Sequence, residues 1–405
     1  MLDLASVRGA FPALASGHVF LDNAGGSQTL RAVAERVSDY LLTSNVQHGA
    51  SYAVSQRAME RVAAAITATT HFMGARSSEE IVVGPSTTQL LINLASSMAG
   101  VLQPGDEIII TEADHEANRG PWKRLAGVGA TIKVWPIDRA TWTLEPSGLA
   151  PLLSERTKLV AFTHCTNLLG TIHDVSALTR VIHDAGAMVC VDGVGYAPHR
   201  ELRVAEWDVD YYVFSAYKVF GPHLGVLYGK RELLDALPTI NHDFITTGAY
   251  KLQPGNLNFE LTYSLLGLYQ YLAGFGGPAR AFADFAEHEE ALTGRLLERL
   301  AELPGVTLHG ERDPARDRRV STVSFSVAGR APAEIVSAVD EHKIGIRHGD
   351  FYARALARAL AEAAGQPDPA AGVIRVSMAH YNTLEEIDRA ADAISDAITR
   401  GPRAA

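Results

Sequence analysis

The sequence predicts an α/β fold in which a large domain, built on a mostly parallel sheet, precedes a smaller α+β domain. The first observation is that short apolar segments alternate with helical stretches between residues 106 and 229. This alternation is typical of parallel strands joined by helices that cover both faces of the sheet. The expected strands are 107–111, 131–135, 158–163, 188–191, 211–214 and 225–228.

The second observation is the segment Gly-Phe-Gly-Gly-Pro at residues 274–278, which marks a boundary between two parts of the chain with different predicted elements. The elements expected beyond it are a long helix over 279–303, strands over 321–327 and 374–378, and helices over 332–342 and 383–398. Thr383 and Glu386 have the spacing of a capping box at the start of the last helix. We therefore expect an N-terminal segment 1–20, a large domain 21–277 and a small domain 278–405.

Composition agrees with a globular chain of this size. Its 405 residues are 47% hydrophobic and 20% charged, which allows two domains with an ample core. The formal net charge of −10 argues against a nucleic acid partner. No apolar run approaches the ~20 residues that span a membrane, no export signal is evident, and two cysteines, both expected in strands, give no disulfide framework. We expect a cytoplasmic protein without a membrane partner.

Lys218 follows the strand expected at 211–214, in a short polar turn that ends in Gly221-Pro222. A lysine held at a strand end, beside the hydroxyl of Ser215, is well placed to form a Schiff base with a carbonyl cofactor. The alternative is an ordinary surface lysine in a loop. Upstream residues favour the cofactor.

Asp192 comes directly after the buried strand expected at 188–191, where an unpaired carboxylate would be costly. A protonated pyridine nitrogen is a suitable cationic partner, and this pairing would keep pyridoxal phosphate an effective electron sink. The alternative is an aspartate that caps a turn. Together, Asp192 and Lys218 favour a pyridoxal phosphate site.

Two further segments suit the same cofactor. Residues 84–88, Gly-Pro-Ser-Thr-Thr, predict a loop that opens a helix, whose free N–H groups and hydroxyls suit a phosphate, although an ordinary helix N-cap is the alternative. His115 follows the strand expected at 107–111, where an imidazole can stack on an aromatic cofactor and move protons. All of these features lie at strand ends, where ligands of such sheets gather.

The chain resembles the class V aminotransferases, a group of fold type I pyridoxal phosphate enzymes, and within them the cysteine desulfurase and selenocysteine lyase branch. The resemblance runs from residues 20–24, Phe-Leu-Asp-Asn-Ala, to residues 375–383, Arg-Val-Ser-Met-Ala-His-Tyr-Asn-Thr. It implies an α-amino acid substrate and a homodimer with shared active sites.

The resemblance also implies roles for single residues. Lys218 would carry the Schiff base, Asp192 would pair with the pyridine nitrogen and His115 would stack on the ring. Arg375 falls on the arginine that binds the substrate α-carboxylate, a task that suits its bidentate fork. The other implied cofactor contacts are Thr87, Thr88, Asn167, Ser215, Tyr217 and Asn256, and the other implied substrate contacts are Asn167, Ala24, His48 and Tyr352.

One departure from the branch concerns sulfur. Tyr352 stands where desulfurases carry the cysteine that accepts sulfur as a persulfide, and a phenol cannot accept it. Cys190 is expected to pack in the strand before Asp192. Cys165 stands two residues before Asn167 and could face the site, but a rigid strand would be a poor sulfur shuttle. Persulfide chemistry of the usual kind is therefore not expected.

Other departures alter the predicted pocket. Gly195 replaces a glutamine that contacts the cofactor's phenolic oxygen in desulfurases, so that oxygen lacks a donor or the glycine leaves space for substrate or water. His48 belongs to a Gln-His-Gly segment where His-Arg-Gly is usual. Asn256 lies in a turn that reaches the neighbouring subunit's phosphate in the branch. These changes predict a repurposed substrate pocket around an unchanged cofactor site.

Three functions are therefore considered. The favoured one is a pyridoxal phosphate enzyme acting on an α-amino acid, either a C–S or other β-eliminating lyase or an aminotransferase. The second is a true cysteine desulfurase that uses Cys165 or an external thiol as acceptor. The third is a non-catalytic binding protein of the same fold, against which the intact Lys218 argues.

Overall fold

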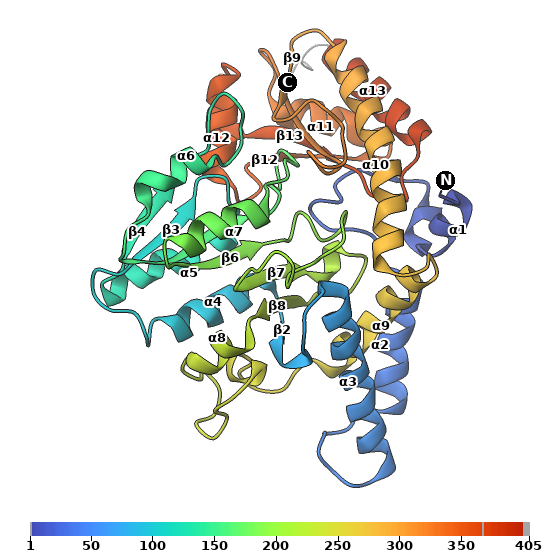
Figure 1. Cartoon of the computed structure of the whole chain (residues 1–405). Coiled ribbons are helices and arrows are strands. Elements are labelled where there is room, and N and C mark those ends of the chain that lie inside the picture. Colours follow the sequence, from blue (N-terminus) through green and yellow to red (C-terminus); the bar gives the residue numbers. More distant parts are fainter. Residues whose placement is uncertain (1, 367, 400–405) are drawn as a thin grey trace.

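The computed structural model describes residues 2–366 and 368–399, and a seven-stranded sheet lies at its centre (Figure 1). The strand order is β2-β8-β7-β6-β5-β3-β4. These strands are β2 (Ile81–Gly84), β3 (Glu107–Thr111), β4 (Thr131–Trp135), β5 (Thr157–Thr163), β6 (Met188–Asp192), β7 (Tyr211–Ser215) and β8 (Gly225–Gly229).

The predicted mostly parallel sheet is confirmed, with one strand added at its edge. Strands β3 to β7 pair in parallel. Strand β8 instead pairs antiparallel with β7, because the short connection 216–224 holds no crossover helix. Strand β2, which the sequence analysis did not predict, pairs antiparallel with β8.

Helices cover both faces of this sheet, as the alternation of elements predicted. The side chain of Ile109 on β3 packs in one apolar cluster with Leu178 and Ile182 of α7, whereas Ile108 packs in another with Leu90 of α4. Successive residues of a strand point to opposite faces, so the buried strands read as continuous apolar runs. The carboxyl ends of the parallel strands are thereby held rigidly at one edge.

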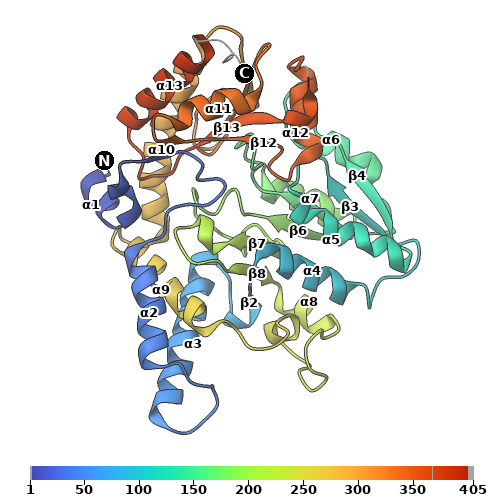
Figure 2. The ribbon, with the colours of Figure 1, turned by 180° about the vertical axis from the view of Figure 1, so that it is seen from behind.

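The helices of the described residues occupy the following ranges: α1 (Leu4–Gly9), α2 (Arg31–Thr43), α3 (Ala53–Met73), α4 (Thr87–Met98), α5 (Gly120–Lys123), α6 (Pro146–Leu149), α7 (Val175–Asp184), α8 (Arg231–Ala236), α9 (Phe259–Ala273), α10 (Pro278–Ala301), α11 (Pro332–Asp340), α12 (Arg354–Ala363) and α13 (Leu384–Thr399). Helices α2, α3 and α9 lie side by side and extend away from the C-terminal helices (Figure 2). None of the described helices is long and apolar enough to cross a membrane.

The C-terminal residues form a second, four-stranded antiparallel sheet with the order β12-β13-β10-β9. Its strands are β9 (Val306–His309), β10 (Thr322–Val327), β12 (Arg347–Gly349) and β13 (Val373–Ser377), and helices α10, α11 and α13 complete its apolar core. The predicted strands and helices of this part are therefore present. At the start of α13, the Thr383 hydroxyl accepts from the Glu386 N–H (3.1 Å) and the Glu386 carboxylate accepts from the Thr383 N–H (3.2 Å), so the capping box is confirmed.

The N-terminal segment packs with this C-terminal part of the chain. Strand β1 (Val19–Phe20) pairs in parallel with β11 (Ile344–Gly345). Val19 and Leu21 are buried in the C-terminal apolar core. Residues 19–21 are thus part of the second core, whereas Val7, Phe11 and Leu14 pack in the core of the large sheet, and the division of the chain at residues 20 and 277 stays a prediction.

Helix α4 begins very close to strand β8, and Gly225 makes this approach possible. A Cβ atom at Gly225 would lie 2.4 Å from the carbonyl carbon of Ser86 and 2.5 Å from the backbone nitrogen of Thr87. Both are backbone atoms, so they cannot rotate away. We predict that Gly225→Ala lowers the free energy of unfolding by about 1–3 kcal/mol through overpacking, measured by urea denaturation.

The matched control is Gly127→Ala, because a Cβ atom at Gly127 meets nothing within 4 Å. We expect this control to change the free energy of unfolding by less than about 0.5 kcal/mol. Equal stabilities of the two variants would contradict the packing argument.

Candidate active site

A cavity lies at the carboxyl ends of the parallel strands, beside the N-terminus of α4. Most of the predicted site residues line it, although they come from four strand ends and one helix. The cavity is lined by Ser86, Thr87, Thr88, His115, Ala117, Thr163, Cys165, Asn167, Asp192, Val194, Gly195, Ser215, Tyr217 and Lys218.

Lys218 ends a short 3₁₀ turn, Ala216–Lys218, that directly follows β7. Its side chain is buried, and its amine makes no hydrogen bond or ion pair to the described residues. Burial lowers the pKa of Lys218 to about 8, helped by the nearby Arg375 and opposed by Asp192 and Asp22. A buried amine with a lowered pKa is a nucleophile and a base near neutral pH.

Asp192 is the last residue of β6 and lines the same cavity as Lys218. One carboxylate oxygen, Oδ1, accepts a hydrogen bond from the Val194 N–H (2.9 Å). Burial raises the pKa of Asp192 to about 6, while the Val194 N–H and Lys218 act in the opposite direction. The carboxylate is thus mostly ionised at neutral pH and able to hold a cation in the cavity.

The N-terminus of α4 offers donors to an anion. Ser86 caps the helix, its hydroxyl accepting from the Gln89 N–H (3.1 Å), and the hydroxyls of Thr87 and Ser215 are hydrogen-bonded to each other (2.7 Å). The free N–H groups of the first turn, the helix dipole and these hydroxyls together suit a phosphate group. Tyr217 closes this end of the cavity and stacks on His223 with a centroid distance of 4.8 Å.

His115 also lines the cavity, and the tautomer of its ring is defined. Its Nδ1 accepts a hydrogen bond from the Ala117 N–H (3.0 Å), so in the neutral ring the proton sits on Nε2. Burial lowers the pKa of His115 to about 4, and the positive charges of Lys218 and Arg375 act in the same direction. The imidazole is therefore neutral at physiological pH, which favours stacking on a flat ring over charge pairing.

Tyr352, the residue in place of the persulfide cysteine, lies at the cavity rim. Its side chain is 66% exposed, and its ring centroid lies 5.3 Å from that of His115. Phe351 and Tyr352 both have left-handed backbone conformations, with φ of 50° and 59°. Their carbonyl groups accept hydrogen bonds from the Asn167 side-chain amide (2.9 Å) and from the Glu116 N–H (2.7 Å). These bonds hold a strained turn against the cavity, a pattern found at functional sites.

Arg375 reaches the rim from β13 of the second sheet. Its guanidinium donates to the Asp22 carboxylate (2.7 Å) and to the Asn167 carbonyl (3.1 Å), and it lies 3.9 Å from the ring centroid of Phe351. Neither Asp22 nor Phe351 is among the site residues predicted from the sequence. Asp22 stands in the quoted motif of residues 20–24, so an acidic residue there was the available signal.

Two buried polar atoms at this site, Asn167 Oδ1 and Arg375 Nε, have no hydrogen-bond partner among the residues that the structure describes. Buried polar groups in proteins are nearly always satisfied, so unpaired ones in a cavity indicate a bound polar group. Together with the Lys218 amine, they leave donors and an acceptor for a polar ligand.

The structure adds a packing reason for Gly195 and corrects the placement of Cys165. A Cβ atom at Gly195 would lie 2.6 Å from the Cys165 carbonyl oxygen, so a close backbone approach requires glycine here, and Gly195 also lines the cavity. The missing donor to the cofactor's phenolic oxygen stays a prediction. Cys165 does not lie in a strand: it follows β5 and forms an isolated bridge with Ile172. Burial raises the pKa of its thiol to about 12, which suppresses the reactive thiolate. Cys190 is buried in β6, as expected.

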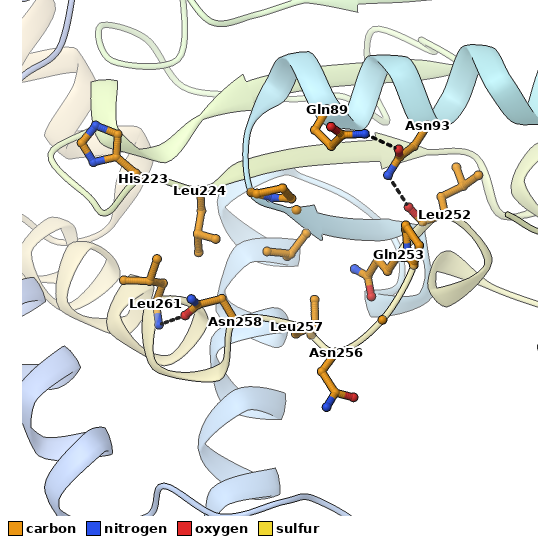
Figure 3. Close-up of a pocket in the computed structure, with 15 residues that line it drawn as sticks. Gln89, Asn93, His223, Leu224, Leu252, Gln253, Asn256, Leu257, Asn258 and Leu261 are labelled. Carbon is orange, nitrogen blue, oxygen red and sulfur yellow. Dashed lines mark hydrogen bonds between the residues drawn. The ribbon is translucent and has the colours of Figure 1, made fainter. Parts of the chain in front are cut away.

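Arg375 and Tyr352 contact residues of the cavity lining without lining it themselves, and three further predicted contacts also lie outside it within one chain. Asn256 lines a separate hollow beside α4, together with Gln89 and Asn93 (Figure 3). His48 stacks on Phe259 with a centroid distance of 3.7 Å, and both line a further hollow that Asn256 also borders. Ala24 is the third of these residues, and its N–H donates a hydrogen bond to the Ser377 hydroxyl (2.8 Å).

Comparisons with known proteins agree with this geometry. A family model described as aminotransferase class-V matches residues 19–390. The chain is 42% identical to the aminotransferase-like protein FGM3 of Gibberella zeae, with 95% of this chain and 96% of that protein covered. It is 34% identical to the cysteine desulfurase-like protein ustD of Aspergillus flavus, with 99% and 92% covered.

Among solved structures, the cysteine desulfurase CsdA of Escherichia coli matches with a TM-score of 0.87 and 28% identity, covering 99% of both chains. The cysteine desulfurase of Thermococcus onnurineus matches with a TM-score of 0.88 and 27% identity, again covering 99% of both. The chain therefore belongs to the class V aminotransferase family, whose members are pyridoxal phosphate-dependent enzymes of fold type I.

Proposed function

We propose that this protein is a pyridoxal phosphate enzyme that acts on an α-amino acid as a C–S or other β-eliminating lyase or as an aminotransferase, without a persulfide on its own chain. The observation that carries the proposal is the buried, unpaired Lys218 amine, which shares one cavity with the Asp192 carboxylate and the N-terminus of α4.

The cavity residues fit this cofactor. The first turn of α4 and the hydroxyls of Thr87, Thr88 and Ser215 would hold the phosphate. Asp192 would pair with the protonated pyridine nitrogen, and neutral His115 would lie on the ring face. Pyridoxal phosphate, when bound, supplies an aldehyde that captures amines and a ring that draws electrons from the α-carbon.

The residues of the chain then divide the remaining work. Arg375 orients the substrate through its α-carboxylate. Lys218, whose pKa of about 8 keeps a useful fraction of free amine, removes the proton from the α-carbon. His115 lines the cavity with its Nδ1 occupied by the Ala117 N–H, so it would accept a proton from the reacting groups only when that hydrogen bond is broken.

A true desulfurase is the less favoured function. It needs a thiol that becomes a thiolate and moves, but Cys165 is 1% exposed and its pKa is raised to about 12. Tyr352 occupies the position of the sulfur acceptor and lies in a turn held by backbone hydrogen bonds. An external thiol acceptor is the remaining form of this hypothesis.

We also propose a homodimer with shared active sites. Asn256 and His48 border a hollow on the outside of the chain, away from Lys218. In a dimer, this surface would complete the site of the second copy rather than that of its own chain. Light scattering with an Asn256→Ala variant, assayed for both mass and cofactor retention, tests this arrangement.

The reaction is tested by product analysis of the loaded enzyme with cysteine, alanine and other amino acids in the absence of added keto acid. A lyase releases keto acid and ammonia or sulfide continuously. An aminotransferase stops after one keto acid per site. No reaction with any α-amino acid would contradict the proposal.

Lys218→Ala is expected to lower turnover at least about a thousandfold while the phosphate site still binds cofactor noncovalently. Lys218→Arg is the control, because it keeps a cation in the cavity but lacks a nucleophilic amine. Initial rates and cofactor content are measured together. Turnover near the wild-type rate in either variant would remove Lys218 from the mechanism.

Cofactor capture by the apoprotein is expected to depend on pH. Because the pKa of Lys218 is lowered to about 8, its reactive neutral fraction rises as pH increases, from about a tenth at pH 7 to about nine tenths at pH 9. The rate of covalent loading with pyridoxal phosphate, followed by stopped-flow absorbance, should therefore have a midpoint near pH 8. A midpoint near the ordinary value of 10.5 would mean that the amine is not desolvated.

Cys165→Ala is expected to leave product formation within about twofold of wild type, since the thiol is protonated at every physiological pH. Cys165 should also resist iodoacetamide in the folded protein, as measured by mass spectrometry. A loss of sulfide formation of more than about tenfold would instead support the desulfurase function.

A further inference from the structure

The guanidinium of Arg375 is held on three sides although it carries an unpaired donor. Nη2 donates to Asp22 Oδ1 (2.7 Å), Nη1 donates to the Asn167 carbonyl (3.1 Å), and the Phe351 ring covers one face at 3.9 Å from Cζ. The side chain is 2% exposed, and its Nε has no partner. A buried arginine that is fixed this tightly and still keeps a free N–H is prepared for one more acceptor.

The free donor lies on the edge that a carboxylate prefers. Nε and Nη2 form the side edge of the guanidinium and bind the two oxygens of a carboxylate in parallel. Asp22 does not occupy this edge as a bidentate partner: Oδ1 takes Nη2, while Oδ2 lies 3.8 Å from Nη1 of Arg347. Since Nη2 carries two hydrogens, it can keep Asp22 and still join Nε in binding a second carboxylate.

The surrounding charge favours such an anion. Asp22 is shared by two arginines, Arg375 and Arg347, which are directly opposite each other on β13 and β12. One carboxylate between two guanidinium groups leaves a net positive charge at the rim. An incoming carboxylate therefore meets one free donor edge and an uncompensated charge, rather than a closed ion pair.

Phe351 completes a closed set of contacts around the guanidinium. Its carbonyl accepts from the Asn167 side-chain amide (2.9 Å), and the Asn167 carbonyl in turn accepts from Arg375. The left-handed conformation of Phe351, with φ of 50°, directs the ring onto the guanidinium. Movement of Phe351 would thus release both Asn167 and Arg375.

We infer that Asp22 and Phe351 are the positioning residues of a substrate-carboxylate site, and that they fix the Arg375 guanidinium so that its Nε–Nη2 edge alone is left to bind the carboxylate side-on. This inference rests on the proposed function, in which Arg375 binds the carboxylate of an amino acid. It adds the reason why the arginine is oriented before substrate arrives.

The test measures the affinity of the purified protein for propionate. The protein is first loaded with pyridoxal phosphate, and propionate binding is then titrated by calorimetry. Asp22→Ala is expected to weaken propionate binding by roughly tenfold to a hundredfold, the range for lost hydrogen bonds to charged groups. Asp22→Asn keeps an acceptor for Nη2 and should restore binding to within about threefold of wild type. Thermal unfolding of each variant checks that the loaded protein remains folded.

Asp388→Ala is the matched control, because Asp388 is likewise shared by two arginines, Arg295 and Arg299, on the far side of the C-terminal core. It should leave propionate binding unchanged. Unchanged binding in Asp22→Ala, or tighter binding in both Asp22 variants, would overturn the inference, because the carboxylate would then be structural or a mere competitor.

The variant Phe351→Leu is a second, independent test, and this substitution does not leave a buried charge without a partner. The variant keeps apolar volume but loses the flat ring, and we expect propionate to bind about fivefold more weakly, as for a lost cation–π contact. Phe351→Tyr keeps the ring and should bind like wild type. Equal affinities of the Leu and wild-type proteins would exclude Phe351 from the site.

Arg375→Ala separates this inference from the proposed function. If that variant binds propionate as well as wild type, Arg375 is not the carboxylate site and the proposed function loses its substrate anchor. If Arg375→Ala loses propionate binding while Asp22→Ala and Phe351→Leu keep it, Arg375 is the carboxylate site and only the positioning roles of Asp22 and Phe351 are wrong.

Discussion

The burial of a primary amine is the constraint on which the rest of this structure depends. Lys218 stands at the end of a central strand, where water cannot stabilise its charge, so its environment must supply what solvent does not. Asp192 raises the pKa of the amine and Arg375 lowers it, and burial exceeds both. The protein thus holds the amine close to the point at which it changes from a cation to a nucleophile.

The residues around this amine come from different parts of the fold. Asp192 and Lys218 end neighbouring parallel strands of the large sheet, whose two faces are packed against helices. Arg375 comes from the second sheet, and Asp22 comes from the segment that joins the N-terminus to both. Strand ends therefore form much of the cavity lining, while the contacts of Arg375 join residues of separate cores.

The first of these groups could be predicted from the sequence, and Arg375 was identified through the family resemblance, whereas the contacts that hold Arg375 could not be predicted. Strand ends show in the apolar pattern, and because parallel strands end at one edge, residues such as His115, Asp192 and Lys218 had to be neighbours. The pairing of Asp22 with Arg375 joins residues 353 positions apart, and no local pattern encodes it. The close backbone approach that requires Gly195 could not be predicted either, because only the folded chain brings the Cys165 carbonyl against it.

The pairing of β1 with β11 has a consequence for synthesis of the chain. Val19 and Phe20 are synthesised more than three hundred residues before their strand partners Ile344 and Gly345. The C-terminal core also buries Val19 and Leu21, so it incorporates residues that are synthesised long before the rest of that core. The large sheet has its strands between these two points and can form while the ribosome is still at work. The ion pair between Asp22 and Arg375, which needs both segments, can therefore form only after the strands of the large sheet have been synthesised.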